Sequence, residues 1–321
     1  MERHIVILGT GGTIAGTGHD SSRAWHYDAA QLSVDQLVAA VPDLAGVPLR
    51  CRQVAQVDSK DMNWSIWQAL ALALADELRR DDVAGVVITH GTDTLEETAY
   101  LLHRLHDGSK PVVLTAAMRP ATAPDADGPR NLLDAVRALR WAEAQGHGGV
   151  AVVMAGQVWS GLHVRKAHTH AVDAFDGGGA SALATVLPNG ELLALVDAWP
   201  RSGGAGWSRL DTPVPPRVEV VTSHADADGV MVRALWAAAP DLKGVVVAAT
   251  GHGTINKPLL AALRGLQQGG VMVWRSSRVA RGGVVPREGD EFTAVEGLTA
   301  AQARLALVLH VLGARLDGSE G

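Results

Sequence analysis

The chain has 321 residues, of which 47% are hydrophobic and 19% are charged, and its formal net charge is −6. This length allows one large or two ordinary domains, and the acidic balance argues against nucleic acid or an anionic membrane as the main partner. The single cysteine, Cys51, excludes an intramolecular disulfide and fits a reducing compartment. We find no apolar stretch long enough to span a bilayer and no signal-peptide pattern, so we expect a cytoplasmic protein.

The first predicted strand, residues 5–8, runs directly into the loop Gly9-Thr10-Gly11-Gly12-Thr13. A loop at the carboxyl end of a strand is where open α/β sheets build their sites. A dinucleotide-binding loop needs a glycine where Ile14 stands, and a P-loop needs a lysine that is missing here. Both nucleotide-binding patterns therefore fail. What remains is the hydroxyl of Thr13, which becomes a nucleophile only if another group activates it.

The stretch that follows, residues 17–23, is small and polar and is typical of a surface loop. It leads into an aromatic cluster of Trp25, His26 and Tyr27. One interpretation is a lid whose aromatic edge closes over the glycine loop. The alternative is that Trp25 and Tyr27 only anchor the loop to the core, and the pattern leaves both open.

The predicted strand at residues 50–57 ends in the polar loop Asp58-Ser59-Lys60-Asp61. A strongly patterned helix follows, and Asp61 is its expected N-cap. Ser59 and Lys60 therefore lie in a strand-to-helix loop. Because the carboxyl ends of parallel strands share one edge of a sheet, we expect this loop on the same side as Thr13.

The predicted strand at residues 85–89 leads into the loop His90-Gly91-Thr92-Asp93. Thr94 and Glu97 have the spacing of a capping box, so we expect Thr94 to cap the next helix and Asp93 to be left for another use. Backbone N–H groups at such a helix start are unpaired and carry the positive end of the helix dipole. They suit the stabilisation of an oxyanion, which makes this loop a second candidate site.

The alternation of strands and helices along the chain favours an α/β fold with a mostly parallel sheet that is flanked by helices. We expect a large N-terminal domain at residues 1–197, a linker rich in proline and glycine at 198–216, and a smaller C-terminal α/β domain at 217–321. Capping-box patterns mark two further helix starts, at Ser33 with Gln36 and at Thr299 with Gln302.

The segment at residues 163–170 is basic and contains His163, Lys166, His168 and His170. Its histidines lack a defined ligand spacing, so we do not expect a metal site. A solvated charge cluster is the ordinary interpretation. The alternative is that Lys166 reaches back to a hydroxyl and activates it, and composition alone does not choose between the two.

Two long motifs carry a resemblance to a known family. They are Thr10-Gly11-Gly12-Thr13-Ile14-Ala15-Gly16 and the run Ile88-Thr89-His90-Gly91-Thr92-Asp93-Thr94-Leu95-Glu96-Glu97-Thr98-Ala99. These motifs resemble the two signatures of bacterial-type L-asparaginases and glutaminase-asparaginases. The likeness continues through residues 58–62, the Lys166 loop, and residues 251–253 and 275–279, so it extends over both predicted domains.

The resemblance implies an L-asparagine amidohydrolase that forms aspartate and ammonia through a threonine acyl-enzyme. Thr13 would be the nucleophile, and Tyr27 would help to take its proton. Thr92, Asp93 and Lys166 would form a second catalytic group. In that group Lys166 favours alkoxide-like character at Thr92 or helps to orient the attacking water. No metal and no organic cofactor is implied, because amide hydrolysis needs only a nucleophile, a proton path and an oxyanion site.

The resemblance also implies how the substrate binds. Asp93 would hold Lys166 charged and bind the α-ammonium, and Ser59 would bind the α-carboxylate. Gly91, Thr92 and Lys60 would complete the substrate-binding set, with the Thr92 backbone N–H placed as an oxyanion donor. The implied partner is L-asparagine, with L-glutamine as the second candidate.

Three departures from the family pattern stand out. Lys60 replaces a glutamine of the secreted high-affinity enzymes, which predicts low glutaminase activity. His252 replaces an asparagine that a neighbouring subunit lends to the site, which introduces a titratable group. Residues 171–180 do not follow the family pattern, so the acidic residue that the partner supplies is not placed, with Glu288 and Asp290 as candidates.

The family further implies a homotetramer built as a dimer of dimers. Alternative functions are a broad-specificity glutaminase-asparaginase and the amidase subunit of a tRNA-dependent amidotransferase, which carries an additional N-terminal domain. A non-enzymatic alternative is an amino-acid-binding or sensor protein on the same scaffold. Such a binding protein has no need of a second hydroxyl with a lysine beside it, as Thr92 and Lys166 would provide.

Overall fold

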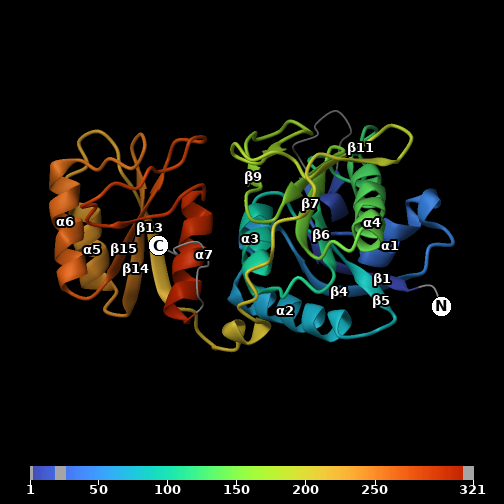
Figure 1. Cartoon of the computed structure of the whole chain (residues 1–321), viewed down its shortest axis with the longest axis horizontal. Coiled ribbons are helices and arrows are strands. Elements are labelled where there is room, and N and C mark those ends of the chain that lie inside the picture. Colours follow the sequence, from blue (N-terminus) through green and yellow to red (C-terminus); the bar gives the residue numbers. More distant parts are fainter. Residues whose placement is uncertain (1–2, 19–26, 314–321) are drawn as a thin grey trace. The chain divides into compact units, whose positions relative to one another are not determined.

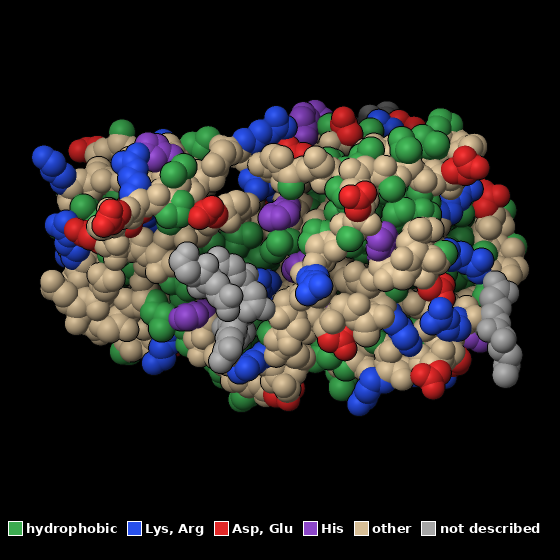
Figure 2. Space-filling view, in the orientation of Figure 1, with side chains coloured by type: hydrophobic (Ala, Val, Ile, Leu, Met, Phe, Trp, Pro, Cys, Tyr) green, Lys and Arg blue, Asp and Glu red, His purple; other side chains and the backbone are tan. Residues whose placement is uncertain are grey.

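The computed structural model describes residues 3–18 and 27–313. The chain divides into two compact units, Met1–Asp211 and Thr212–Gly321 (Figure 1). Both are α/β units, which confirms the predicted fold class, whereas the exact limits of the linker stay a prediction. Among the described residues, no helix has both the length and the apolar character needed to cross a membrane. Acidic and basic side chains are interspersed on the face that Figure 2 shows.

The first unit is built on an eight-stranded sheet with the order β12-β11-β8-β7-β6-β5-β1-β4. The strands from β7 to β4 run parallel, and the strands from β8 to β12 are antiparallel additions at one edge. Its strands are β1 (His4–Gly11), β4 (Leu49–Val57), β5 (Val83–Thr89), β6 (Pro111–Thr115), β7 (Gly149–Met154), β8 (Gln157–Ser160), β11 (Ala184–Val186) and β12 (Leu192–Ala194). Its helices are α1 (Val34–Ala39), α2 (Trp64–Leu78), α3 (Leu95–Leu105) and α4 (Gly128–Ala144), and two small strand pairs join β2 (Thr17–Gly18) to β3 (Tyr27–Asp28) and β9 (Arg165–Lys166) to β10 (Phe175–Asp176).

Helices cover both faces of this sheet, so β1 is buried on both sides. Successive residues of a strand point to opposite faces. Ile5 and Ile7 enter the apolar layer of α1 and α4, and Val6 and Leu8 enter the layer of α2 and α3. Burial on both faces explains why the strand is a continuous apolar run, as is usual for parallel strands.

The start of α2 differs from the prediction. The side chain of Asn63 accepts a hydrogen bond from the Ile66 backbone N–H at 3.2 Å, so Asn63 is the N-cap and the prediction of Asp61 is wrong. Asp61 instead ends a short 3₁₀ turn, Ser59–Asp61, which Asp58 caps. The polar loop therefore makes one more turn before the helix begins, and this turn keeps Ser59 at the carboxyl end of β4.

The second unit is a four-stranded parallel sheet with the order β13-β14-β15-β16. The apolar layer of α5 and α6 covers the face that includes Val245 and Val247, and α7 packs against the same strands. The predicted capping boxes of Ser33 and Thr299 are both confirmed at their helix starts. The elements of this unit are β13 (Arg217–Thr222), α5 (Val230–Ala238), β14 (Leu242–Ala249), α6 (Lys257–Gln268), β15 (Met272–Ser277), β16 (Thr293–Ala294) and α7 (Ala300–Val311).

Buried histidines in the first unit predict a loss of stability in acid. His90, His103 and His106 are almost completely buried, and burial lowers the pKa of each to about 4. The unfolded chain therefore binds more protons than the folded chain between the ordinary histidine pKa and about 4. The free energy of unfolding falls as the pH drops through that window, by up to about 1.4 kcal/mol per pH unit for each histidine.

Urea midpoints measured between about pH 7 and about pH 5 check this prediction. We expect the slope of the urea midpoint against pH to become smaller in His103→Leu, because one buried imidazole has been removed. The matched control is His224→Gln, which changes an exposed histidine and leaves the slope unchanged. Equal midpoints at both pH values in the unmodified chain would contradict the prediction.

Candidate active site

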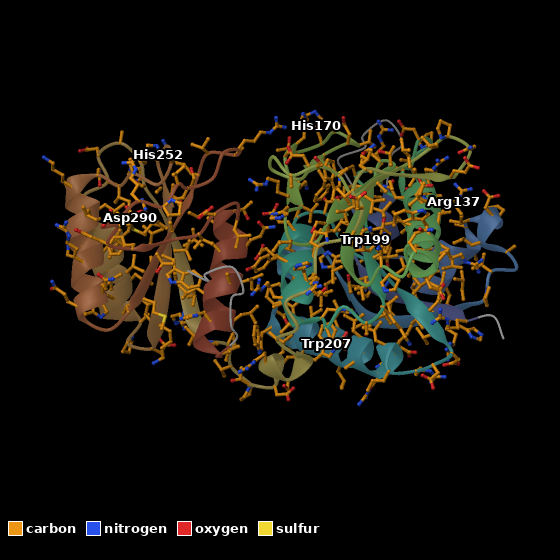
Figure 3. The ribbon with its side chains drawn as sticks, viewed as in Figure 1. Arg137, His170, Trp199, Trp207, His252 and Asp290 are labelled. Carbon is orange, nitrogen blue, oxygen red and sulfur yellow. The ribbon has the colours of Figure 1, made fainter. Side chains whose placement is uncertain are left out.

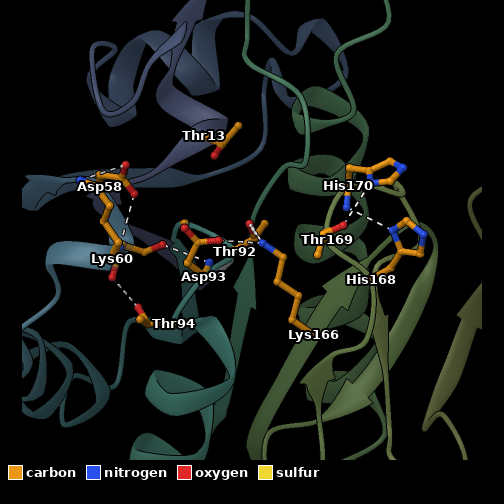
Figure 4. A network of polar contacts seen from close by, with 12 residues as sticks. Thr13, Asp58, Lys60, Thr92, Asp93, Thr94, Lys166, His168, Thr169 and His170 are labelled. Atoms are coloured by element: carbon orange, nitrogen blue, oxygen red, sulfur yellow. Dashed lines mark hydrogen bonds and ion pairs between the residues drawn. The ribbon is translucent and has the colours of Figure 1, made fainter. Parts of the chain in front are cut away.

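The two predicted loops touch through their backbones. β1 and β5 are parallel neighbours, so their carboxyl ends lie side by side. Gly12 has a φ of +82°, and a Cβ on Gly12 would lie 2.3 Å from the Cα of Gly91, so only glycine fits this approach. Thr13 and Thr92 directly follow these two glycines. The structure therefore brings the two threonines to one edge of the sheet (Figure 4).

Thr13 opens a short 3₁₀ turn, Thr13–Ala15, and is 7% exposed. Its hydroxyl oxygen lies 2.8 Å from that of Tyr27, and either group can donate the hydrogen bond. Tyr27 belongs to β3, which pairs with β2. The rest of the predicted lid, with Trp25 and His26, lies outside the described residues.

Lys166 connects the second loop to β9. Its Nζ donates hydrogen bonds to the Thr92 hydroxyl at 2.9 Å and to the Asp93 carboxylate at 2.7 Å. Thr92 is 5% exposed, and Lys166 is largely buried, whereas Asp93 is half exposed. A cation this close to a buried hydroxyl stabilises negative charge on its oxygen more strongly than it would in water. Of the two interpretations of the basic segment, this contact favours the activating lysine.

Ser59 joins the loops after β4 and β5. Its hydroxyl accepts a hydrogen bond from the Asp93 backbone N–H at 3.2 Å, and its carbonyl accepts one from the Thr94 hydroxyl at 2.8 Å. Thr94 makes no side-chain cap bond to α3, so the predicted capping box with Glu97 is wrong. The Thr94 hydroxyl serves the contact between the loops instead, and it fixes Ser59 beside Gly91.

Lys60 does not turn toward the threonines in this structure. Its ammonium pairs with Asp61 at 2.5 Å and with Asp58 at 3.3 Å, and its side chain is 61% exposed. The interpretation of Lys60 as a substrate-binding residue therefore stays a prediction. A rotation of this flexible side chain is needed before it can approach Thr13 or Thr92.

The sequence patterns missed a buried polar network behind Gly91. The indole of Trp67 only donates, so its N–H bonds to the Thr98 oxygen at 2.9 Å, and Thr98 then donates to His90 Nε2 at 3.0 Å. This leaves His90 Nδ1–H to donate to the Gly91 carbonyl at 2.7 Å. Because a trans peptide directs its C=O and N–H to opposite sides, the network turns the Thr92 N–H away from His90. Its only sequence signal was His90 itself, inside the second motif.

Of the three histidines of the basic segment, His168 and His170 lie at the surface, whereas His163 is half-buried. His168 and His170 make an edge-on ring contact, and the His168 Nδ1 accepts backbone hydrogen bonds from His170 and Ala171. Figure 3 labels His170 in this turn. Within residues 3–18 and 27–313, no group of three or more His, Cys, Asp or Glu side chains could hold a metal ion.

The remaining predicted residues belong to the second unit. The Arg287 guanidinium bonds to His252 Nε2, and Asp290 pairs with Arg275 and accepts the Arg287 backbone N–H at 2.7 Å (Figure 3). Asp290 is thus held within its own unit, and Glu288 is exposed. The role of either acid at a neighbouring site stays a prediction.

Two family models match this chain, one in each unit. The model of the family described as "Asparaginase, N-terminal" matches residues 4–196, and that of the "Glutaminase/Asparaginase C-terminal domain" matches residues 217–319. The chain belongs to the asparaginase family. This confirms the resemblance that the two motifs indicated, and it identifies an enzyme of the hydrolase class.

Several individual asparaginases are similar to this chain. The crystal structure of the probable cytoplasmic L-asparaginase from Campylobacter jejuni superimposes with a TM-score of 0.89 at 36% identity, covering 97% of this chain and 95% of that one. L-asparaginase 2 of Escherichia coli is 37% identical over 281 residues, which is 87% of this chain and 79% of that protein. The glutaminase-asparaginase of Pseudomonas fluorescens biotype A is 35% identical over 303 residues, with 90% and 79% covered.

Proposed function

We propose that this enzyme hydrolyses the side-chain amide of L-asparagine to aspartate and ammonia, through an ester on Thr13. The observation that carries the proposal is the contact of one ammonium, Lys166 Nζ, with both the Thr92 hydroxyl and the Asp93 carboxylate, next to the loop of Thr13. A hydroxyl, a phenol and a lysine–carboxylate pair supply the nucleophile and the proton path that amide hydrolysis needs.

In the first half-reaction the Thr13 oxygen attacks the amide carbon, and its proton passes to the Tyr27 oxygen, 2.8 Å away, while the phenol gives up its own proton toward the amide nitrogen. The carbonyl oxygen becomes an oxyanion, and we place the Thr92 backbone N–H as a donor to it. The C–N bond then breaks, the nitrogen takes up the proton, and ammonia leaves. The aspartyl group remains on Thr13 as an ester.

In the second half-reaction water attacks this ester. The Thr92 hydroxyl accepts a hydrogen bond from the Lys166 ammonium, and its own proton stays directed toward the reacting water. The proton that the water loses passes through the Tyr27 hydroxyl to the Thr13 oxygen as the ester C–O bond breaks, and the Lys166 ammonium stabilises the negative charge that develops during the attack. The Asp93 carboxylate balances the charge of the Lys166 ammonium between turnovers. Hydrolysis returns Thr13 to its hydroxyl form and releases aspartate.

For substrate recognition we assign the half-exposed Asp93 to the α-ammonium and the Ser59 hydroxyl to the α-carboxylate. Ser59 already accepts the Asp93 N–H, so its own proton is directed to another acceptor. Lys60 and Gly91 complete the set. Neither a metal nor an organic cofactor enters any step.

L-Glutamine is the second candidate substrate, and one observation favours it. Lys60 pairs with Asp58 and Asp61, and this arrangement keeps its long side chain out of the space beside Thr13. The expectation from the sequence is the opposite, because a lysine turned inward would shorten the pocket. We retain low glutaminase activity as the prediction, because the exposed, flexible Lys60 side chain is free to rotate toward Thr13 when substrate binds.

The experiment is ammonia release from L-asparagine and from L-glutamine. We expect kcat/KM for asparagine to exceed that for glutamine by about tenfold or more, since one extra methylene in a tight pocket costs about 1–3 kcal/mol. In Lys60→Ala the ratio should fall. Comparable values in the unmodified enzyme would establish a broad-specificity glutaminase-asparaginase instead, and binding without ammonia release would establish a sensor.

We further infer a cytoplasmic homotetramer, a dimer of dimers. The single cysteine and the similarity to the probable cytoplasmic enzyme of Campylobacter jejuni support the compartment, although a related Haemophilus influenzae protein is described as periplasmic. Family membership supports the assembly. Light scattering on the purified enzyme should give four times the chain mass of 33.5 kDa, and the mass of a single chain would contradict the assembly.

A further inference from the structure

Lys166 is held at both of its ends by the same short stretch of chain. Its Nζ contacts Thr92 and Asp93, and its backbone N–H donates to the Glu96 carboxylate at 2.7 Å. Glu96 lies in the first turn of α3, directly after the Thr92 loop. The residues that accept the Lys166 ammonium and the residue that accepts its backbone N–H therefore lie within residues 92–96, in the loop before α3 and its first turn.

The Glu96 carboxylate accepts the Lys166 N–H on the side of β9 where, in the described part of the chain, no second strand pairs with it. β9 has only two residues and pairs on one side with β10, through Phe175 and Asp176. The next residue, Ala167, bonds back to the Ala174 carbonyl at 2.7 Å, whereas the Lys166 N–H points the other way, to α3. A carboxylate that accepts a backbone N–H makes a charge-assisted bond, which is stronger than a bond between neutral groups.

A lysine side chain is long and flexible, so the place of its Nζ depends on where its backbone is anchored. The anchor of a two-residue strand is weak by itself. We propose that Glu96 is a positioning residue: it fixes the Lys166 backbone at the start of α3, so that the ammonium stays within hydrogen-bond distance of Thr92. This inference rests on the proposed function of Lys166 and adds a residue to which that function assigns no role.

The test compares three variants by steady-state kinetics on L-asparagine. Glu96→Ala removes the acceptor, and we expect kcat to fall by about 10- to 100-fold with KM changed by less than about threefold, because a misplacement of about 1 Å costs that much. Glu96→Gln keeps an acceptor oxygen and should restore kcat to within about threefold. Glu97→Ala removes a neighbouring carboxylate from the same helical turn, and with it a similar interaction with the helix dipole. It should stay close to the unmodified enzyme.

A double mutant separates positioning from a general structural effect. In a Lys166→Met background, Glu96→Ala should lower the residual kcat by less than about twofold, since the ammonium that Glu96 positions is gone. An undiminished loss in that background would overturn the proposal. So would a Glu96→Gln variant that behaves like Glu96→Ala, or a Glu97→Ala variant that loses as much.

Amide hydrogen exchange at Lys166, measured without substrate, tests the positioning role of Glu96 independently of the proposed function. We expect exchange to become at least about tenfold faster in Glu96→Ala and to stay slow in Glu96→Gln. An unchanged exchange rate in Glu96→Ala would overturn the proposal that Glu96 fixes the Lys166 backbone, even in an active enzyme. If the unmodified enzyme were inactive but the variants showed the expected exchange pattern, the proposed reaction would be rejected, and the role of Glu96 in fixing the Lys166 backbone would still hold.

Discussion

Replacing Thr13 by alanine is expected to lower kcat for ammonia release from L-asparagine by about 10³-fold or more, the scale of effect that follows the loss of a covalent nucleophile. The Thr13 hydroxyl is the group from which we begin the reaction, and its partner in the structure is the Tyr27 hydroxyl at 2.8 Å. Without the oxygen no ester can form, and the rest of the site can only bind the substrate. KM should therefore change much less than kcat.

Thr13→Ser is the matched variant, because it keeps the nucleophilic oxygen and removes only a methyl group. We expect it to retain far more activity than Thr13→Ala. Thermal melting of both variants checks that the fold is intact, since Thr13 is buried in the glycine loop. An alanine variant that keeps more than about a tenth of kcat would show that the nucleophile lies elsewhere.

The second large effect is expected at Thr92. Thr92→Val keeps the branched shape of the side chain and removes the oxygen that accepts the Lys166 ammonium at 2.9 Å. The Lys166 ammonium loses one of its two acceptors, and the water that attacks the ester loses its orienting group. We expect kcat to fall by about 10²- to 10³-fold, measured by ammonia release under saturating substrate.

The control for this substitution is Thr185→Val, the same change on β11, which lies next to the edge strand β12 and away from β1 and β5. The Thr185 hydroxyl likewise takes part in one side-chain hydrogen bond, which it donates to Gln157 at 3.1 Å, so the change in stability should be similar. Activity should stay within about twofold of the unmodified enzyme. If Thr92→Val kept equal activity, the lysine contact would be structural rather than catalytic.

The sequence was sufficient for the strands that carry the site. β1 and β5 are buried on both faces, so each is a short apolar run that ends at glycine or at polar residues. The edge where these strands end follows from parallel pairing. The positions of Thr13 and Thr92 at one edge could therefore be predicted before any contact was known.

Contacts that depend on competition between nearby groups could not be predicted. Both Asp61 and Asn63 suit an N-cap, and the extra turn after β4 gives the cap to Asn63. Thr94 has the spacing of a capping box, but the Ser59 carbonyl lies close enough to accept the hydrogen bond of its hydroxyl. Local pattern contains no information about such a neighbour, because it comes from another loop.

Contacts between distant segments were also beyond the sequence. Lys166 is 74 residues from Thr92 and 70 from Glu96, and it lies on a strand of two residues that has no periodicity to detect. The direction of the hydrogen bonds from Trp67 through Thr98 and His90 to Gly91 likewise depends on which groups the fold buries together. The family resemblance named Lys166, but it did not name the carboxylate that holds its backbone.

The central claim is that an ester forms on Thr13 and that Thr92 serves its hydrolysis. Rapid acid quench of the Thr92→Val enzyme during turnover of L-asparagine, followed by peptide mapping with mass spectrometry, tests both parts together. We predict an aspartyl ester on the peptide that contains Thr13, at higher occupancy than in the unmodified enzyme. An ester on the Thr92 peptide of the unmodified enzyme, or ammonia release without any ester on Thr13, would contradict the account.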